Sequence, residues 1–506
     1  MSLPAALALH AAGRLAEAEI AYRAILGGDP DNAGALHGLG LIAQVTGKGE
    51  IAVRLLALAA EKNPGDPAIA AHLGAALEML GRADEAEAAL ARALALAPDH
   101  AEARFCLANL RRDRHDAAGA ESAYRAALAA EPAHLGAAVN LGGMLRGMHR
   151  LDEAAAWVAR ALVQQPGNPQ LHTNLANARH HQRRFAEARA AFAEALARAP
   201  DDAAIHYNHA HTLLAHDDFA AGFRAYEWRW QTREFDLLRR PLALPRWDGR
   251  GAAGRRILVH AEQGFGDAIQ FCRYVPLVAR SGLRVVFEVP APLVRLMAGL
   301  PGIEQVVART DTVPDADCEC PLLSLSLALG RTADMQTGAI PYLVPPPELA
   351  RLWAGRLAGL RGLKVGLCWA GNAFPDPTRT IPSAALATLG GLAGVTFVSL
   401  QKDGAAAPAG LDMIDLTADI ADFADTAALM AALDLVISID SAPVHLAGAL
   451  GRPTWLLNRR AVDWRWRDGE TGAPWYPAIR QFRQPDWGDW DSVLGAVRDE
   501  LAALAG

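Results

Sequence analysis

The most constraining feature of this chain is a set of six prolines that recur at one constant interval. They are Pro30, Pro64, Pro98, Pro132, Pro166 and Pro200. Proline has no amide hydrogen and a fixed φ angle, so it stops a helix from continuing. A stop repeated at a constant interval predicts that one helical unit recurs from the N-terminus to Pro200.

Other positions keep the same period. The expected turn between the two helices of each unit, half a period away from the prolines, is occupied by Gly13, Gly47, Gly81, His115, His149, Arg183 and Asp217. A leucine followed by a small residue recurs on the first helix, at Leu39, Leu73, Leu107, Leu141 and Leu175. Small residues let paired helices approach closely. Two antiparallel helices within this interval match one tetratricopeptide repeat, so we expect an all-α superhelix over 1–236.

Composition narrows the remaining possibilities. The 506 residues are enough for three domains. A net charge of −7 argues against a nucleic-acid binder, and no apolar run is long enough for a membrane span. The apolar N-terminus lacks a basic region and continues into the first repeat, so we interpret it as repeat rather than signal peptide. Five scattered cysteines indicate a cytoplasmic location.

After a linker at 237–254, short apolar runs alternate with helices and predict α/β structure. We expect a first Rossmann-like lobe over 255–347, with strands at 257–260, 285–289 and 305–307. A second lobe over 348–506 has expected strands from 364 and at 395–400, 435–439 and 454–457. The aromatic residues at 219–230 predict a capping helix that docks onto the first lobe. Ligands of such sheets bind at the carboxyl ends of the strands.

Two motifs stand at such strand ends. The turn EQGFGD at 262–267 follows the first strand, and DSAPVH at 440–445 follows a later one. Free amides at the start of a helix form an anion site, which the hydroxyl of Ser441 and the imidazole of His445 would complete. The alternative for the second motif is a simple strand-to-helix turn, with Asp440 or Ser441 as N-cap and His445 in the core.

Several familiar chemistries are not indicated. The turn Gly264-Phe265-Gly266 lacks the third glycine of a dinucleotide site, and neither a G-x-S-x-G elbow nor a Walker loop occurs. Two D-x-D matches, Asp315-Ala-Asp317 and Asp489-Trp490-Asp491, follow no clear buried strand, so we attribute them to chance. No metal ligand is therefore predicted.

The motifs GFGDAIQFCRYVPL and DSAPVHLAGALGRP resemble the bacterial heptosyltransferase family, which are sugar transferases of the two-lobed GT-B fold. Ala442 and Pro443 depart from the family's usual glycine and its neighbour. The resemblance covers about residues 255–460 and implies a terminal helix, at 492–504, that crosses back onto the first lobe. The repeats resemble the N-terminus of O-linked N-acetylglucosamine transferases. Repeats joined to a GT-B half also occur in flagellin glycosyltransferases, so the resemblance implies a protein acceptor.

One set of asparagines agrees with a protein acceptor. Asn140, Asn174 and Asn208 precede the repeating leucine position in successive repeats, and Asn109 and Asn177 form a possible second row. The resembling transferases use asparagines at this place to grip a peptide. An amide offers both a donor and an acceptor to an extended backbone, whatever its sequence. The alternative is that these are ordinary surface asparagines.

The resemblance implies metal-independent transfer of a sugar from a nucleotide-sugar to a Ser or Thr hydroxyl. Asp267 is the candidate general base, unless it only caps the following helix. His260 lines the same opening. Arg379 and Lys402 are candidates for holding the leaving phosphate, unless they are solvated charges, and Gln401 for reading the base. The donor site would further include Asp440, Ser441, Ala442 and His445.

Three functions remain open at the level of the sequence. The first is a protein O-glycosyltransferase, acting on flagellin. The second is an envelope-glycan transferase that uses its repeats for complex assembly. The third is a non-catalytic scaffold. The nucleotide is also open, because the different resemblances suggest ADP, UDP or CMP, and no cofactor beyond this co-substrate is expected.

Overall fold

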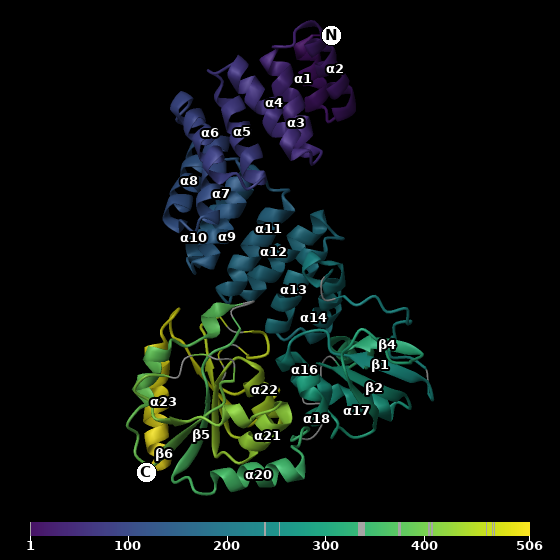
Figure 1. Cartoon of the computed structure of the whole chain (residues 1–506), viewed down its shortest axis with the longest axis vertical. Helices are drawn as coiled ribbons and strands as arrows, with labels where there is room; N and C mark the ends of the chain where they lie inside the picture. Colours follow the sequence, from purple (N-terminus) through teal and green to yellow (C-terminus); the bar gives the residue numbers. More distant parts are fainter. Residues whose placement is uncertain are drawn as a thin grey trace. The chain divides into compact units, whose positions relative to one another are not determined.

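The structure is a computed structural model of the chain (Figure 1). It forms two compact units, Met1–Pro200 and Asp201–Gly506. The residues that it describes are 2–236, 239–251, 253–331, 340–372, 376–402, 405, 408–461, 463–467, 469 and 471–506. Residues 237, 238 and 252 of the predicted linker therefore lie outside the described residues.

The first unit consists of six helical hairpins stacked in sequence order (Figure 1). Their helices are α1 Leu3–Ala11, α2 Leu15–Gly28, α3 Ala33–Val45, α4 Gly49–Lys62, α5 Pro67–Met79, α6 Ala83–Leu96, α7 Ala101–Asp113, α8 Ala117–Ala130, α9 Leu135–Gly147, α10 Leu151–Gln164, α11 Pro169–His181 and α12 Phe185–Arg198. The period predicted from the prolines is confirmed.

Each periodic proline ends one hairpin, and a capping residue two positions later begins the next. The capping side chains accept a hydrogen bond from the first turn of the following helix; they are Asn32, Asp66, His100, His134, Asn168 and Asp202. A cap satisfies an amide that has no partner within the helix. A proline followed by a cap thus sets where every hairpin starts.

The turn inside each hairpin requires a left-handed backbone. All seven residues predicted at this turn have φ between 61° and 76°, whether they are glycine or not. In the first three hairpins glycine adopts this conformation without steric cost. His115, His149, Arg183 and Asp217 adopt it in the later hairpins, so the fold imposes the turn even where the residue disfavours it.

The small residue on the first helix is matched to the residue that it faces on the second. A Cβ at Gly40, Gly74 or Gly142 would lie 2.7 Å or less from a branched side chain, that of Leu56, Leu90 or Val158. Where the small residue is alanine, the equivalent second-helix residue is aromatic; the pairs are Ala6 and Tyr22, Ala108 and Tyr124, Ala176 and Phe192, and Ala210 and Tyr226. A flat ring leaves room for one more methyl group than a branched chain does.

This matching predicts opposite effects for two glycine substitutions in the repeats. Gly74→Ala places a methyl group against Leu90 Cγ and should lower the free energy of unfolding by about 1–3 kcal/mol. Gly143→Ala adds a methyl group in open space on α9 and should raise it by up to about 1 kcal/mol. Urea denaturation followed by circular dichroism measures both. Equal effects of the two substitutions would contradict the matching.

The second unit begins with one more hairpin, α13 Ala203–Ala215 and α14 Phe219–Tyr226, followed by η1 Glu227–Gln231 and α15 Arg233–Asp236. Phe223 on α14 makes edge contacts with Phe271 and Trp464 of the α/β region. The predicted docking of this aromatic helix is confirmed. Although its register continues that of the repeats, this hairpin belongs to the compact unit of the α/β region.

Two parallel sheets follow. The first has the order β3-β2-β1-β4, with β1 Arg256–His260, β2 Arg284–Val289, β3 Ile303–Ala308 and β4 Cys318–Pro321. The second has the order β10-β9-β8-β5-β6-β7, with β5 Leu363–Cys368, β6 Val395–Ser399, β7 Met413–Ile414, β8 Leu435–Ile439, β9 Thr454–Asn458 and β10 Ile479–Arg483. The α/β class is confirmed, whereas β4, β7 and β10 were absent from the predicted strands.

Helices flank both sheets. In the first lobe they are α16 Phe265–Phe271, α17 Val275–Arg280, α18 Val294–Met297 and α19 Leu325–Ala328. In the second they are α20 Pro347–Leu357, α21 Phe423–Ala431, α22 Ala442–Ala449 and α23 Trp490–Ala505. The expectation that α23 crosses to the first lobe is wrong. Its buried residues, among them Leu494 and Leu501, pack with β5 and β8 in the core of the second lobe (Figure 1).

Candidate active site

The two sequence motifs meet in the structure. Helix α16, which begins in the GFGD turn of the first lobe, packs against α22 of the second. The approach is closest at Gly266, where a Cβ would lie 2.9 Å from Cδ2 of His445 and 3.7 Å from Cα of Ala442. The second glycine of the turn is therefore required by contact between the lobes. Residues from two separate sheets form one site.

Asp267 has two partners at this junction. Its Oδ2 accepts a hydrogen bond of 3.2 Å from the amide of Gly264, the N-cap of α16. Its Oδ1 forms an ion pair of 2.5 Å with Nη2 of Arg465. Burial raises the pKa of Asp267, and the charge of Arg465 opposes that rise. The capping role considered for Asp267 is thus present, and the side chain, 22% exposed, remains accessible for a second role.

Arg465 connects the components of this site. The side chain is 10% exposed and lies over the ring of Trp464, with Cζ 4.4 Å from the ring centroid. Besides Asp267, its guanidinium donates to Asp463 Oδ1 at 2.8 Å and to Gln270 Oε1 at 2.7 Å. A planar guanidinium presents its donors in a fixed fork, so three partners at once define its orientation.

Asp440 and Asp463 are two carboxylates that interact electrostatically. Burial and the nearby charge of Asp463 raise the pKa of Asp440 to about 6, against the opposing effects of Trp466, Arg379 and Arg465. The pKa of Asp463 is lowered, since its attraction to Arg465 outweighs its own burial. Of the two, Asp463 is therefore the carboxylate that stays ionised, and Asp440 is the one with a pKa nearer to neutral pH.

The start of α22 is open on the side of its N-cap. Ser441 occupies the N-cap position, but its side chain accepts no bond from the first turn. Its hydroxyl instead donates to the carbonyl of Ile439 at 3.3 Å. Arg379 donates to the backbone carbonyl of Asp440 at 3.2 Å, which brings a cation to the same strand end. An uncapped helix start beside an arginine suits an anionic group.

His445 is satisfied within the protein. Its Nδ1 lies 3.1 Å from the hydroxyl of Tyr476, and its ring stacks on Trp466 with centroids 5.2 Å apart. Burial, with the charge of Arg465 in support, lowers the pKa of His445 to about 3. The imidazole is therefore neutral, as in the alternative that places it in the core, and its Nε2 side is the one that faces Gly266.

Gln401 and Lys402 lie at the end of β6, each with a backbone partner. The carbonyl oxygen of Gln401 accepts hydrogen bonds from the amides of Trp369 and Ala370. The ammonium of Lys402 donates to the carbonyl of Ile420. Gln401 thus closes the turn after β5, next to Cys368, whose sulfur is 3.8 Å from the Ser441 hydroxyl. Gln401 is therefore close to the DSAPVH motif at 440–445, while Lys402 is directed toward Ile420.

The partner of His260 is Glu319. Its Nε2 lies 2.9 Å from a carboxylate oxygen of Glu319 on the adjacent strand β4. Both side chains are largely buried, with exposures of 12% and 11%. The structure therefore gives His260 a partner within the first sheet, and its assignment as a catalytic residue remains a prediction.

Helix α13 approaches this site. The hydroxyl of Tyr226 on α14 is hydrogen-bonded to Gln263, in the turn that leads to Asp267. On α13, the rings of Tyr207 and His211 lie 5.4 Å and 5.7 Å from that of Tyr226. His211 also interacts electrostatically with Asp463, whose charge raises the pKa of the imidazole against the larger lowering by burial. The last hairpin thus takes part in the candidate site.

The asparagines differ in their partners. In the first unit, Asn140 donates to Asn109 Oδ1 at 2.9 Å, and Tyr124 donates to the same oxygen at 2.6 Å. Asn174 donates to the carbonyl of Val139 at 3.1 Å. These amides therefore bridge neighbouring repeats. Asn177 is half-buried on α11, and Asn208 lies on α13 of the second unit. Peptide binding by this set remains a prediction.

The sequence analysis missed Arg465 and Asp463. The tryptophans around them, Trp464, Trp466 and Trp475, are buried. The arginine between two of these tryptophans was not considered. An arginine in the run WRWR, in the loop after the buried strand β9, was the available signal, since a charge flanked by buried rings needs a partner.

Comparisons with known proteins agree with a repeat region followed by an α/β region. Tetratricopeptide repeat models match residues 67–110, 107–169 and 169–202. The model of glycosyltransferase family 9 (heptosyltransferase) matches residues 407–483, which include the Asp440 motif and Arg465. The chain thus matches tetratricopeptide repeat models in its N-terminal part and the glycosyltransferase family 9 model in its C-terminal part.

One curated relative and several solved structures are similar to this chain. Protein FlbA of Caulobacter vibrioides is 29% identical over 58% of the chain, which spans 54% of FlbA. The structure of the hetero-tetramer Cut9-Hcn1 is 20% identical, covers 42% of each chain and has a TM-score of 0.39. The repeat protein TTC0263 of Thermus thermophilus is 23% identical, with 36% and 99% covered and a TM-score of 0.31. At such scores neither structure adds to the fold described above.

The partners of Arg465 predict a large effect of its removal. Arg465→Gln leaves Asp267 and Asp463 without their cation and should lower the free energy of unfolding by about 3–5 kcal/mol. The matched control is Arg467→Gln, because Arg467 is 34% exposed and pairs with Asp217 at 3.1 Å. The control should cost at most about 1 kcal/mol. Similar losses in chemical denaturation of both variants would show that Arg465 has no special role.

The raised pKa of Asp440 predicts a pH-dependent stability. A carboxyl whose pKa rises from 3.8 to about 6 on folding stabilises the fold below the lower value and loses that contribution as pH rises through the upper one. Asp440→Asn should therefore stabilise the protein at pH 7.5 relative to pH 4, compared with wild type. Thermal unfolding at both values measures this difference. A difference that is constant with pH would contradict the assigned environment of Asp440.

Proposed function

We propose that the chain is a protein O-glycosyltransferase, which moves a sugar from a nucleotide-sugar to a Ser or Thr hydroxyl of a protein held by its repeats. The observation that carries the proposal is the meeting of the two motifs, with Gly266 against His445 and Asp267 bonded to Arg465. A transferase needs an acceptor hydroxyl and a donor phosphate at one place, and this junction joins residues suited to each.

Asp267 is proposed as the general base. The hydroxyl oxygen of the acceptor attacks the anomeric carbon of the donor, the bond from that carbon to the phosphate oxygen breaks, and the hydroxyl proton passes to Asp267. Its bonds to Gly264 and Arg465 leave lone pairs on both carboxylate oxygens. Arg465 favours the ionised form that a base requires, while burial keeps the carboxylate more basic than a fully solvated one.

The leaving nucleotide is proposed to bind at the start of α22. In the first turn Pro443 has no amide hydrogen, and the amide of Val444 bonds to the Ser441 carbonyl. The amide of Ala442 is therefore the proposed backbone donor, and Arg379 adds positive charge beside Asp440. Ser441 contributes its hydroxyl, and Gln401 stabilises the adjacent turn by accepting a hydrogen bond from the amide of Ala370. In this proposal no metal ion takes part, and the nucleotide is CMP, UDP or ADP.

The acceptor is proposed to be flagellin. Support comes from the order of the domains, repeats followed by a family 9 region, which resembles that of flagellin glycosyltransferases. Repeats of this kind form extended surfaces for other polypeptides. No helix of the described residues has the length and apolar character needed to span a bilayer. We propose that the reaction takes place in the cytoplasm.

Substitution of the base tests the function. Cells that lack this chain are complemented with wild type or Asp267→Asn, and the intact mass of flagellin is measured. Wild type should restore an added sugar mass, whereas Asp267→Asn should lower the modified fraction at least about 100-fold, since general-base catalysis contributes roughly 10²–10⁴ in rate. Asparagine can still accept the bond from Gly264, so the helix cap is retained.

Asp489→Asn provides the control, because Asp489 caps α23 by accepting a bond of 3.0 Å from the amide of Ser492. It should leave the modified fraction unchanged. Normal modification by a folded Asp267→Asn protein would rule out this base. A flagellin mass that does not depend on the chain at all would rule out flagellin, and a new mass on an envelope glycan would favour the heptosyltransferase-like alternative.

A further inference from the structure

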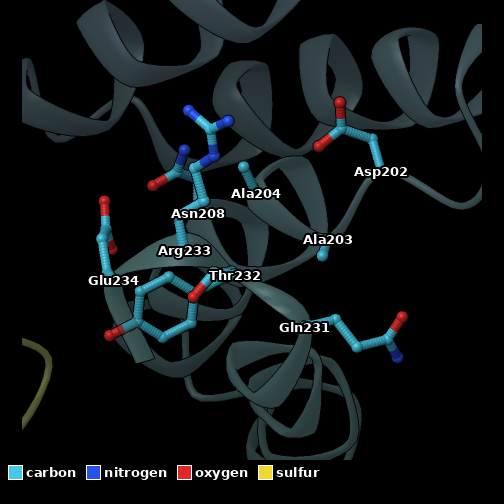
Figure 2. Close-up of a pocket in the computed structure, with 9 residues that line it drawn as sticks. Asp202, Ala203, Ala204, Asn208, Gln231, Thr232, Arg233 and Glu234 are labelled. Carbon is cyan, nitrogen blue, oxygen red and sulfur yellow. The ribbon is translucent and has the colours of Figure 1, made fainter. Parts of the chain in front are cut away.

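The buried groups around His445 differ from those of the polar hollow on the last hairpin. That hollow, of about 330 Å³, is lined by Asn208 and Arg233 among others (Figure 2). Within the described part of the chain, none of its lining residues bonds Asp267 or the DSAPVH motif. A hydroxyl that does reach this motif is that of Tyr476, which is fully buried.

Tyr476 and the imidazole of His445 hold each other in place on α22. A Cβ at Gly448 would lie 2.5 Å from the ring of Tyr476, so glycine makes room for that ring. His445 and Gly448 are three residues apart and share one face of the helix. The imidazole contacts Tyr476 edge-on at 5.8 Å between centroids and stacks on Trp466 at 5.2 Å. Two aromatic rings therefore define the orientation of His445.

The hydrogen bonds behind Tyr476 determine where its proton lies. The hydroxyl of Tyr342 donates to the carbonyl of Ile269 and accepts from Nη2 of Arg273, both at 3.0 Å. The oxygen of Tyr476 lies 3.5 Å from that of Tyr342 but 3.1 Å from Nδ1 of His445. A hydroxyl has one proton to donate, and 3.5 Å is beyond the usual length of an O–H···O bond. Tyr476 therefore donates to Nδ1 of His445.

The surrounding charges favour the same arrangement. Burial raises the pKa of the Tyr476 hydroxyl, and the charge of Arg273, 4.9 Å from the ring centroid, opposes that rise and makes the hydroxyl a better donor. Burial, Arg465 and Arg273 lower the pKa of His445 to about 3, against the opposing charge of Asp463. A neutral imidazole that accepts a bond at Nδ1 carries its ring proton on Nε2.

The Nε2 edge of His445 faces the junction of the lobes. A Cβ at Gly266 would lie 2.9 Å from Cδ2 and 3.5 Å from Nε2, so glycine leaves space beside this edge. Among the residues that the structure describes, none forms a hydrogen bond with Nε2. Asp267, the proposed base, directly follows Gly266. An N–H at this position is therefore available to a substrate.

We propose that Tyr476 is a positioning residue, which holds His445 as the Nε2–H tautomer and thereby presents a neutral N–H donor at the junction. This N–H would bond the phosphate oxygen of the nucleotide-sugar that gains negative charge as its bond to the sugar breaks. A donor fixed in advance stabilises such a charge. The other tautomer would present a lone pair to the same oxygen and repel it. The role toward the substrate rests on the proposed function, whereas the tautomer does not.

The tautomer is measured on the full chain, without nucleotide or acceptor, by NMR of protein labelled with ¹⁵N in its histidine rings. The signals of His445 are those that disappear in His445→Gln. Wild type should show an Nε2–H imidazole at pH 7.5. Tyr476→Phe keeps the ring packed on Gly448 but removes the donor, and it should shift these signals toward the Nδ1–H form. An Nδ1–H pattern in wild type, or an unchanged pattern in Tyr476→Phe, overturns the proposal.

The effect on transfer is measured as the fraction of flagellin that carries the sugar in complemented cells. Tyr476→Phe should lower this fraction about tenfold, the value of one well-placed hydrogen bond. In a His445→Gln background it should change the fraction less than about twofold, because glutamine carries an N–H that needs no tautomer. Tyr22→Phe is the control. It removes a hydroxyl 3.3 Å from Nδ1 of His10 in the first repeat and should leave the fraction unchanged.

The outcomes separate this proposal from the one on which it rests. Equal losses from Tyr476→Phe in both backgrounds would show that Tyr476 does not act through His445, and would overturn its positioning role. A loss confined to the background with His445, in protein that still unfolds cooperatively, supports it. A flagellin mass that does not depend on the chain contradicts the proposed function alone, since the NMR pattern still decides whether Tyr476 fixes the tautomer.

Discussion

Arg465 is a buried cation that bonds groups from both lobes of the α/β unit. Arg465 comes from the loop after β9, and its partners lie on α16 of the first lobe and in its own loop. A buried guanidinium is costly unless its donors are satisfied. The structure meets that cost by bringing acidic and amide groups from both lobes to one point. The contact between the lobes and the charge state of the candidate base thus have a common origin.

This arrangement makes the two roles considered for Asp267 compatible: it can cap α16 and still be a candidate base. A capping carboxylate uses one oxygen, and an ion pair to Arg465 fixes the other. The result is a carboxylate of defined orientation that is still partly exposed to solvent. In the same cluster the pKa of Asp463 is lowered, so this carboxylate keeps its charge, while the pKa of Asp440 is raised to about 6. Neighbouring carboxylates with diverging pKa values are typical of sites that move protons.

The sequence predicted those parts of the fold that are encoded locally. The turn at His149 could be placed because its position recurs in every repeat, and β8 because it is a continuous apolar run. Strand β10 was missed because its edge position allows Arg480 and Arg483 within the strand. The ion pair of Arg465 joins residues 198 positions apart, and no local pattern encodes such a contact. The two motifs of the site were visible, but the group that links them was not.

The last hairpin shows that a period in the sequence and a unit in the structure need not coincide. Ala210 and Tyr226 obey the matching of small and aromatic residues seen in the repeats. The same Tyr226 bonds Gln263, and Phe223 packs between Phe271 and Trp464, so the outer surface of the hairpin is adapted to the α/β region. A helix pair with both sets of contacts is fixed to the candidate site, whatever the preceding repeats do.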